Sequence, residues 1–507
     1  MNRFEEYILK PFIHSARLFR DRNAFYIDGE YYSYGSFWQR VAAIQKHIPQ
    51  NDGTGDVIAL AIHDDLDTYA TIFALWMVGK AYVPLHPNQP LDRNLNIIGQ
   101  VGTNCIFDTQ KESAFSEWGN ESDDRHVIIT TELVSDNRYD FDMQNVDDEE
   151  LAYILFTSGS TGVPKGVQIS RKNVAAFIDS FWKTGIEINE EDRCMQVFDL
   201  TFDVSVQSFI VALTRGACVY TVPYGQVKYL QAASLIQMQH ITFGAMAPSM
   251  LRYLRPYFDE MDATSLKACI LTAEACPVDL MEDWFRCATN TDIYDFYGPT
   301  EATVYCTYYK LSREESNRSL NGIISIGKPL ANVEAIIVDE NGSIINDQSK
   351  GELCIAGDHL SPGYWKNQEK NESAFFEKKY RGIVQRFYHT GDLCYWDESG
   401  NIMYSGRIDQ QAKIQGFRVE LGEIEYHARE YFHKEKNVIA IAFQDKDNLT
   451  EIALFIESEQ KNSDDLMHYL RSKMPSYMIP TRIVYEPEFP LNKSEKIDRN
   501  ALKNRLR

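Results

Sequence analysis

Hydroxyl residues, glycines and one lysine crowd into a single stretch of the sequence, TSGSTGVPKG at residues 157–166. Glycine lets backbone N–H groups approach a ligand closely, while the hydroxyls and Lys165 add donors and a positive charge. Such groups suit the oxygens of a phosphate. A Walker A loop requires Gly-Lys followed by Ser or Thr, whereas Pro164 precedes Lys165 here and Gly166 follows it, which disfavours a kinase. A surface loop without a ligand is the alternative.

Two further stretches place aromatic and acidic residues beside tight turns. YDFYGPTE at residues 294–301 offers Tyr297, which could stack on a planar base, and Glu301, which could bind Mg²⁺ because this hard cation takes oxygen ligands. YHTGDL at residues 388–393 offers Asp392, whose carboxylate can accept hydrogen bonds from two ribose hydroxyls. An ordinary turn after a strand is the alternative for the first stretch, and packing within a strand is the favoured interpretation of His389.

Asp203 lies between apolar neighbours in FDLTFDVS, residues 198–205. A carboxylate in such surroundings is costly unless it is paired or hydrogen-bonded. One interpretation is a helix N-cap ahead of the apolar run at residues 206–211, which the spacing allows. The other is a carboxylate that waits for a cationic substrate. The surroundings distinguish the two, because a cap does not need an apolar wall.

These residues need a scaffold, and the surrounding sequence alternates between strand and helix patterns. An apolar run at residues 151–156 leads into the hydroxyl-rich loop and predicts a buried strand. Further buried strands are predicted at residues 57–62, 81–85, 241–247 and 268–272, and helices at residues 68–79 and 249–254. Alternation of this kind predicts a layered α/β architecture.

Length and charge limit the possible functions. A chain of 507 residues is too long for one core, so two or more domains are expected. The 51 Lys and Arg against 73 Asp and Glu give a net charge of −22, without a long basic run. This balance argues against nucleic acid or an anionic membrane as a partner. Any polyphosphate site must therefore be built locally, from loop amides, metal and a few cations.

Cysteine spacing and the N-terminus indicate the cellular compartment. The nine cysteines are scattered and form no Cys-x-x-Cys pair, so zinc or a disulfide framework is not expected and a reducing cytosol fits. Acidic residues follow Met1 where a signal peptide would need an apolar core, and no apolar run reaches membrane-spanning length. A cytoplasmic location without a membrane partner is the expectation.

Taken in order, the motifs resemble those of the adenylate-forming superfamily, which includes nonribosomal peptide synthetase adenylation domains, acyl-CoA synthetases and luciferases. The fixed order carries the resemblance, which covers nearly the whole chain. The motifs are residues 157–166, 294–301, 351–357, 388–393, 404–425 and 490–499. The resemblance implies a large N-terminal multi-sheet layered α/β domain, residues 1–408, and a small mobile α+β C-terminal domain, residues 409–507, with the hinge at Asp409.

The resemblance also implies ATP and Mg²⁺ as cofactors, with Glu301 as the metal ligand and Lys496, Glu301 and Thr157 as catalytic residues. Lys496 takes its role from its place in the last motif, where Ser494-Glu495 replaces the usual Asn-Gly. Gln415 stands where many members have arginine. The implied nucleotide contacts are Thr157, Ser158, Gly159, Ser160, Thr161, Lys165, Asp295, Phe296, Tyr297, Gly298, Thr300, Asp392, Tyr404, Arg407 and Lys496.

The resemblance points to an amino acid as the substrate. Superfamily members that activate amino acids keep an aspartate at the position of Asp203, where it pairs with the substrate ammonium. The implied pocket wall is Asp203, Val204, Gln207, Ala245, Ile270, Thr272, Phe296, Val304 and Tyr305. The opening Asp-Val-Gln, with Ile270 and Val304, resembles prolyl-activating domains, whereas Phe296 and Tyr305 depart from them and would shrink the pocket. L-proline is the expected substrate, and alanine, including D-alanine, is the runner-up.

Two half-reactions are implied by the resemblance. The substrate carboxylate attacks the α-phosphorus of ATP, pyrophosphate leaves, and the acyl group then passes to the phosphopantetheine thiol of a carrier protein. Because the chain begins close to its first strand and ends eight residues after Arg499, we expect a free-standing enzyme that acts on a separate carrier protein. A coenzyme A ligase and a binding module without turnover are the rivals, although intact Glu301, Asp392 and Lys496 argue against the second.

Overall fold

The computed structural model describes residues 2–49, 56–135, 143, 146–159, 162–222, 225–409, 411–458, 464–491 and 497–506. The chain divides into two compact units. The larger unit comprises Met1–Pro87, Ile98–Leu155 and Gly166–Ile408, and the smaller unit comprises Asn88–Ile97, Phe156–Lys165 and Asp409–Arg507. The hinge at Asp409 remains a proposal.

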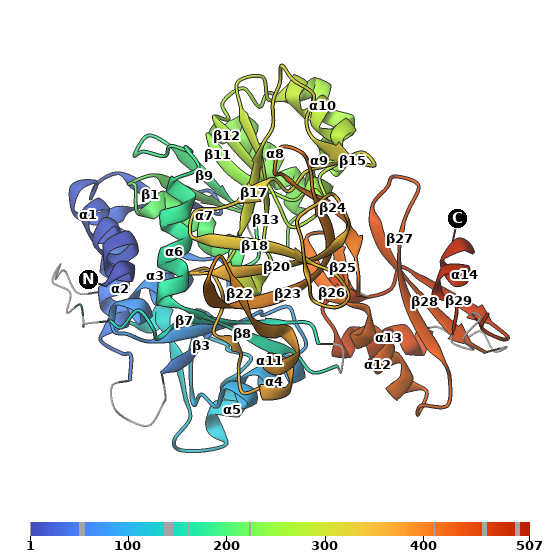
Figure 1. The fold of residues 1–507 in the computed structure, drawn as a ribbon. Coiled ribbons are helices and arrows are strands. Elements are labelled where there is room, and N and C mark those ends of the chain that lie inside the picture. The colour runs from blue at the N-terminus through green and yellow to red at the C-terminus, as the bar shows by residue number, and fades with distance from the viewer. Residues whose placement is uncertain are drawn as a thin grey trace. The chain divides into compact units, whose positions relative to one another are not determined.

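One sheet of the larger unit is parallel in its centre and antiparallel at both ends (Figure 1). Within the described residues its strand order is β17-β14-β13-β12-β11-β9-β10-β1-β2. The strands are β1 (Asn23–Ile27), β2 (Glu30–Ser33), β9 (Arg193–Gln196), β10 (Cys218–Thr221), β11 (Phe243–Met246), β12 (Ala268–Leu271), β13 (Asp292–Tyr297), β14 (Thr307–Lys310) and β17 (Lys328–Pro329).

A second sheet leads into the hydroxyl-rich loop. Over the part of the chain that is described, its order is β21-β8-β7-β4-β3-β5-β6. The strands are β3 (Val57–Ala61), β4 (Ala81–Leu85), β5 (Cys105–Asp108), β6 (His126–Ile129), β7 (Leu151–Thr157), β8 (Lys165–Ser170) and β21 (Gly363–Tyr364). The strands predicted from apolar runs at residues 57–62, 81–85 and 151–156 are therefore confirmed.

The third sheet is antiparallel and carries Asp392. Its described strands run β19-β18-β20-β23-β22, and β24 pairs with β23. Their bounds are β18 (Val333–Val338), β19 (Ile344–Ile345), β20 (Gly351–Gly357), β22 (Phe375–Tyr380), β23 (Ile383–Trp396) and β24 (Ile402–Arg407). A short hairpin is formed by β15 (Ser319–Leu320) and β16 (Ile323–Ile324).

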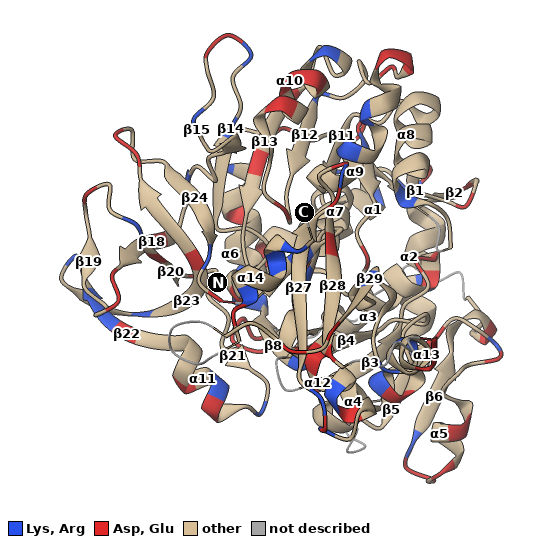
Figure 2. Ribbon diagram, turned by 90° about the vertical axis from the view of Figure 1, so that its right-hand side faces the viewer, with Lys and Arg blue, Asp and Glu red and all other residues tan. Residues whose placement is uncertain are grey.

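Helices connect and cover these sheets. They are the π-helix η1 (Glu5–Leu9), α1 (Lys10–Leu18), α2 (Tyr34–Gln45), α3 (Leu66–Met77), α4 (Leu91–Val101), α5 (Ser116–Asn120), α6 (Arg171–Trp182), α7 (Asp203–Leu213), α8 (Lys228–Gln239), α9 (Pro248–Leu254), α10 (Val278–Cys287) and α11 (Gln368–Ala374). Short 3₁₀ turns are η2 (Thr130–Glu132), η3 (Arg255–Glu260) and η4 (Thr300–Ala302). In Figure 2, both acidic and basic residues colour these helices, and acidic residues predominate on α10.

Alternate residues of β11 and β12 face two different cores. Ala245 and Ile270 pack into one core with residues of α6 and α7, and Met246 and Leu271 pack into another with residues of α8, α9 and α10. The strands pair in register, with Ala245 opposite Ile270. Because both faces are covered by helices, these strands are apolar throughout and show no alternating pattern in the sequence. This arrangement confirms the predicted layered α/β class.

The smaller unit has its own mixed core. Residues of its helices pack on residues of its strands around Ile424, Leu454 and Leu470. Strand β27 pairs antiparallel with β28, which pairs parallel with β29, and β25 forms a hairpin with β26. The elements are β25 (Gln411–Ile414), β26 (Phe417–Glu420), α12 (Leu421–Tyr431), β27 (Val438–Gln444), β28 (Thr450–Glu457), α13 (Asp464–Lys473), η5 (Ser476–Met478), β29 (Arg482–Glu486) and α14 (Arg499–Asn504).

Two further features concern the whole chain. Among the described residues, no helix is both long and apolar enough to cross a membrane. The nine cysteines are buried thiols: Cys105, Cys194, Cys218, Cys269, Cys276, Cys287, Cys306, Cys354 and Cys394.

Candidate active site

Asp203 is the first residue of α7, and its carboxylate is buried at the start of that helix. The N-cap is Phe202 and makes no side-chain capping bond, so the interpretation of Asp203 as a helix cap is wrong. Asp203 Oδ2 instead accepts the Val304 N–H at 3.2 Å. Burial raises the pKa of Asp203 to about 6; hydrogen bonds from Val304 and Thr300 oppose this shift, and the negative charge of Glu301 adds to it.

The other predicted wall residues lie in three parts of the larger unit and are buried there. Two follow it on α7, four lie on or just beyond β11, β12 and β13, and two lie in the segment after η4. They are Val204, Gln207, Ala245, Ile270, Thr272, Phe296, Val304 and Tyr305, all buried. Their role as a substrate wall remains a prediction.

Two aromatic rings and an amide of the predicted wall lie close together. The rings of Phe296 and Tyr305 have centroids 4.9 Å apart. The Tyr305 hydroxyl donates a long hydrogen bond of 3.5 Å to Gln207 Oε1. Gln207 is fully buried, and its Nε2 has no acceptor among the described residues. A buried donor left without a partner is costly, so a ligand oxygen would satisfy this amide.

Glu301 is a buried carboxylate in η4. Its Oε1 accepts the Tyr364 hydroxyl at 2.5 Å, and its backbone oxygen accepts the Ser361 N–H at 2.9 Å. The Glu301 charge is close enough to raise the pKa of Asp203. A divalent cation at Glu301 would offset that repulsion, and a carboxylate is the oxygen ligand that Mg²⁺ prefers. The residues present therefore fit the predicted metal.

Tyr297, Asp392 and Arg407, three predicted nucleotide contacts, meet in one hydrogen-bonded group. The Tyr297 hydroxyl donates to Asp392 Oδ2 at 2.5 Å, and an Arg407 guanidinium N–H donates to Asp392 Oδ1 at 2.9 Å. Asp392 on β23 lies opposite Arg407 on β24, which also carries Tyr404. Each carboxylate oxygen has two lone pairs, so Asp392 retains capacity for ribose hydroxyls.

The remaining predicted contacts of the larger unit lie on or just beyond β13. Asp295 and Phe296 lie on this strand, and Thr300 begins η4. A Cβ atom on Gly298 would lie 2.5 Å from the Val304 carbonyl oxygen. Only glycine therefore lets the segment with Val304 approach the end of β13 so closely.

In the smaller unit, the hydroxyl-rich loop already binds carboxylates. The Gly159 N–H donates to Glu423 Oε2 at 2.9 Å, and Lys165 Nζ pairs with Glu420 Oε1 at 3.0 Å. The Ser158 hydroxyl accepts the Glu420 N–H at 3.0 Å, and the Thr157 hydroxyl lies 3.5 Å from the Lys165 carbonyl oxygen. Two of the donors predicted for phosphate oxygens, the Gly159 N–H and Lys165 Nζ, thus bind oxyanions in this structure.

Some predicted residues lie outside the described part of the chain. Ser160 and Thr161 of the loop and Lys496 of the last motif are among them, as are Ser494 and Glu495. Gly159 lies at the edge of the described loop. A Cβ atom there would lie 2.0 Å from the Val163 carbonyl oxygen, so this position requires glycine.

Sequence reasoning missed three tyrosines at the site. Tyr364 binds Glu301, and the charge of Asp203 raises the pKa of Tyr82 and Tyr153, although burial is the larger cause for both. Tyr82 and Tyr153 lie on β4 and β7. A phenol in the middle of a buried strand was the available signal, because a buried hydroxyl needs a polar neighbour.

A second group of possible metal ligands lies between β20 and β23. Ligand atoms of Glu352, Cys354 and His389 lie within 4.8 Å of one another. His389 Nδ1 lies 2.7 Å from Glu352 Oε2, and the Gly391 N–H donates to Glu352 Oε1 at 2.9 Å. The His389 ring also contacts Phe376, with centroids 4.3 Å apart. These contacts agree with strand packing, the favoured interpretation of His389.

Curated relatives share much of this chain but are far longer. The sequence is 31% identical over 454 residues to bacitracin synthase 3 of Bacillus licheniformis, a match covering 89% of this chain and 7% of that protein. It is 28% identical over 494 residues to tyrocidine synthase 1 of Brevibacillus parabrevis, covering 97% of this chain and 44% of that protein. The chain thus spans less than half the length of either relative.

Solved structures share the fold along nearly the full chain. The Vibrio cholerae adenylation domain AlmE, in complex with glycyl-adenosine-5'-phosphate, aligns with a TM-score of 0.84 at 23% identity, covering 98% of this chain and 97% of that one. Holo-PA1221, an NRPS protein containing adenylation and PCP domains, aligns with a TM-score of 0.84 at 20% identity, covering 98% and 84%.

A family model provides the assignment. The model described as AMP-binding enzyme matches residues 12–365, a span that includes Asp203 and Glu301. This span is well over half of the chain, and it carries the hydroxyl-rich loop and the motif that ends at Glu301 in the predicted order. The chain therefore belongs to the family of AMP-binding enzymes.

Proposed function

We propose that this protein activates an amino acid as its adenylate and then transfers the aminoacyl group to a carrier-protein thiol. The observation that carries the proposal is the buried Asp203 carboxylate, which has a pKa raised by burial and no lysine or arginine bonded to it by any described contact. A substrate ammonium would supply the missing positive charge. The family assignment supports ATP as the second substrate.

The first half-reaction joins two anions. A carboxylate oxygen of the amino acid forms a bond to the α-phosphorus of ATP, and the bond from this phosphorus to the pyrophosphate oxygen breaks. Residues of this chain would reduce the repulsion between the two anions: N–H groups and hydroxyls at Thr157 and Ser158, and the ammonium of Lys496. Bound Mg²⁺ would contribute further charge neutralisation at Glu301.

Orientation of the two substrates falls to separate groups. Asp203 would hold the ammonium of the amino acid, and Asp392, with Tyr297 and Arg407 as its partners, would bind the ribose hydroxyls. Fixing both reactants reduces the entropy lost on reaching the transition state.

A compact side chain suits the wall beside Asp203. The close rings of Phe296 and Tyr305 leave less room than two aliphatic residues would. The order Asp203, Val204, Gln207 on α7 favours L-proline, and D-alanine or another small amino acid is the alternative. That AlmE was solved with a glycyl adenylate supports a small substrate for this fold.

For the second half-reaction we propose a phosphopantetheine thiol on a separate carrier protein as the acceptor. The thiolate attacks the acyl carbon of the adenylate, a thioester forms and AMP leaves. The pairing of adenylation and PCP domains in PA1221 supports this acceptor. An acyl-CoA ligase, which would use the same chemistry with a free thiol, is the rival.

Pyrophosphate exchange into ATP tests the proposal. The twenty standard amino acids and D-alanine are supplied one at a time with Mg²⁺, and we expect L-proline to dominate. Asp203→Ala should abolish amino-acid-dependent exchange, whereas ATP binding measured by calorimetry should persist. Exchange driven by aryl or fatty acids that survives Asp203→Ala would favour the acyl-CoA ligase.

The binding module without turnover is tested separately through Lys496. Lys496→Ala should slow adenylate formation by on the order of a hundredfold or more while nucleotide binding is largely kept, since the loss falls on transition-state charge. Wild-type protein that binds ATP and the amino acid but forms no adenylate would favour the module.

A further inference from the structure

Two neighbouring β-branched residues after η4 have an unusual backbone conformation. Thr303 has φ 51° and Val304 has φ 67°, both in the left-handed region. This region is disfavoured for residues other than glycine, and most strongly for β-branched side chains. The Val304 N–H nevertheless meets Asp203, and Tyr305 follows at the pocket wall. Such a conformation persists only where surrounding contacts impose it.

The contacts that impose it come from one loop, residues 358–361. The Thr303 hydroxyl donates to the His359 carbonyl oxygen at 2.7 Å. His359 Nδ1 lies 2.9 Å from the Tyr305 carbonyl oxygen. The Ser361 N–H donates to the carbonyl oxygen of Glu301 at 2.9 Å. The loop therefore bonds to the segment before, within and after the left-handed pair.

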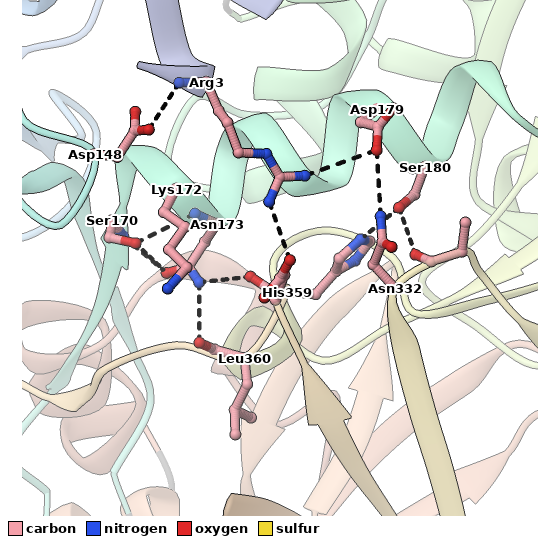
Figure 3. Close-up of polar contacts among 12 residues, drawn as sticks. Arg3, Asp148, Ser170, Lys172, Asn173, Asp179, Ser180, Asn332, His359 and Leu360 are labelled. Atoms are coloured by element: carbon pink, nitrogen blue, oxygen red, sulfur yellow. Dashed lines mark hydrogen bonds and ion pairs between the residues drawn. The ribbon is translucent and has the colours of Figure 1, made fainter. Parts of the chain in front are cut away.

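The loop itself is fixed by α6 and the N-terminus (Figure 3). Asn173 Nδ2 donates to the carbonyl oxygens of Asp358 at 2.9 Å and Leu360 at 3.0 Å. The Ser180 hydroxyl lies 3.0 Å from His359 Nε2. Arg3 forms an ion pair with the Asp358 carboxylate at 3.0 Å. These anchors hold the loop at both ends, so His359 has a fixed position from which to bond Tyr305.

Both nitrogens of the His359 ring lie within hydrogen-bonding distance of oxygen atoms. The ring is fully buried, and burial lowers its pKa to about 4, so the imidazole is neutral. A carbonyl oxygen only accepts, so the Nδ1 contact with Tyr305 is a hydrogen bond in the tautomer that carries the ring proton on Nδ1. The Phe177 ring packs against both residues: its centroid lies 6.1 Å from that of the His359 ring and 5.8 Å from that of the Tyr305 ring.

We propose that His359 is a positioning residue for the amino-acid subsite, which acts by holding the left-handed Thr303–Val304 turn against Asp203. The proposal rests on the proposed function for its kinetic consequence, but the hold on the turn can be measured without substrate. With the ring proton on Nδ1, His359 donates to the Tyr305 carbonyl oxygen, and the turn places the Val304 N–H at Asp203 and the Tyr305 ring beside it.

Hydrogen exchange at the turn gives the substrate-free test. In His359→Ala, deuterium uptake of a peptide that covers residues 303–305 should be faster than in the wild type. His359→Asn should restore protection, because its Nδ2 can replace Nδ1 as donor to the Tyr305 carbonyl oxygen. His63→Asn is the matched control: His63 bonds Asp108 at 2.9 Å elsewhere in the larger unit, and uptake at the turn should not change.

Kinetics give the second test. Pyrophosphate exchange with His359→Ala should show an amino-acid KM raised on the order of tenfold, with the ATP KM changed less than twofold, because small displacements at a binding site are costly. His359→Asn should recover most of the loss, a rescue that general destabilisation would not produce. If His359→Ala does not fold, Thr303→Val removes the other bond of the loop to the turn and should have the same two effects.

The outcomes separate this inference from the proposed function. Faster hydrogen exchange at the turn in His359→Ala, together with a raised amino-acid KM, supports the positioning role of His359. Unchanged hydrogen exchange, or faster hydrogen exchange with both KM values unchanged, overturns that role. If hydrogen exchange at the turn is faster in His359→Ala but the wild type activates no amino acid, His359 does hold the turn and the proposed function is rejected.

Discussion

At the residue scale, Asp203 must be ionised to bind an ammonium group, yet its surroundings favour the protonated acid. Burial raises its pKa to about 6, above the ordinary value of 3.8. The bonds from Val304 and Thr300 stabilise the ionised form only in part. A bound ammonium would favour the carboxylate and lower this pKa. Substrate affinity and protonation of Asp203 are therefore coupled.

This coupling predicts the pH dependence of substrate binding. As pH falls below about 6, the wild-type amino-acid KM should rise, by up to tenfold per pH unit, because protonated Asp203 cannot pair with the ammonium. Asp203→Asn should raise this KM about 10- to 100-fold at pH 8 and abolish the dependence, since a charged hydrogen bond contributes about 1.5–3 kcal/mol. Pyrophosphate exchange from pH 5 to pH 8 measures both. A wild-type KM that stays constant from pH 8 to pH 5 would contradict the role of Asp203.

The same shift predicts a pH-dependent stability. Because the folded-state pKa lies above the unfolded one, the contribution of Asp203 to stability is fully present below pH 3.8 and is lost as pH rises through about 6. Asp203→Asn removes this titration, so its stability relative to the wild type should increase between pH 4 and pH 7, by at most about 3 kcal/mol. Thermal denaturation of both proteins without substrate measures the difference. A pH-independent difference would mean that Asp203 titrates normally.

At the element scale, α6 links the N-terminal segments of the fold to the loop at residues 358–361. Ser170 and Asn173 form a capping box at its start, with each side chain bonded to the backbone of the other. The Asn173 amide group then reaches the loop carbonyls. Asn173 thus orders both the start of α6 and the loop at residues 358–361.

Removal of the cap tests this arrangement. Ser170→Ala leaves the Asn173 N–H without its acceptor and should lower the free energy of unfolding of the larger unit by about 1–2 kcal/mol. Urea denaturation followed by tryptophan fluorescence measures the change. Ser373→Ala is the control, because Ser373 is exposed near the end of α11 and should change stability by less than about 0.5 kcal/mol. Equal losses in both variants would exclude the capping box as the cause.

The sequence predicted elements better than it predicted the turns between them. Apolar runs located β3, β4 and β7 within one or two residues, because burial on both faces demands such runs. The left-handed pair at Thr303 and Val304 could not be predicted, since both residues favour extended backbone. It is set by His359, a contact over more than fifty positions. The unusual burial of the Asp203 carboxylate could be anticipated, because its apolar neighbours are visible in the local sequence.

At the scale of the whole molecule, two compact units do not follow the order of the chain. Residues 88–97 and 156–165 group with residues 409–507 rather than with their sequence neighbours. Within this smaller unit, Glu423 bonds both Arg93 and the Gly159 N–H, at 2.6 Å and 2.9 Å. Chain order alone could not reveal this grouping, because it joins short segments to residues far along the sequence.

The proposed hinge leads to a prediction about the two half-reactions. If the small domain rotates about Asp409 between them, Asp409→Pro should restrict that rotation by fixing φ. Pyrophosphate exchange should stay within about threefold of the wild type, while thioester formation on a carrier protein falls at least about tenfold. Exchange and mass-detected carrier loading, measured on one preparation, give the ratio.

The matched control is a proline at a position that tolerates one. Lys446 follows Asp445 in a turn of the smaller unit, which the Asn448 N–H closes by donating to the Asp445 carbonyl oxygen at 3.0 Å. Proline is favoured at this second position of a turn, so Lys446→Pro should leave both half-reactions unchanged. Equal effects of Asp409→Pro on exchange and on loading would reject the hinge.

Every thiol of this chain belongs to the larger unit, since residues 88–97, 156–165 and 409–507 contain no cysteine. Burial also raises the pKa of thiols such as Cys194 and Cys276, and the thiolate is the species that alkylating reagents attack. The thiols of the folded protein should thus not react with iodoacetamide. Any labelling that is observed should report opening of the larger unit. Adding one exposed probe, Ser472→Cys, would give the smaller unit its own signal.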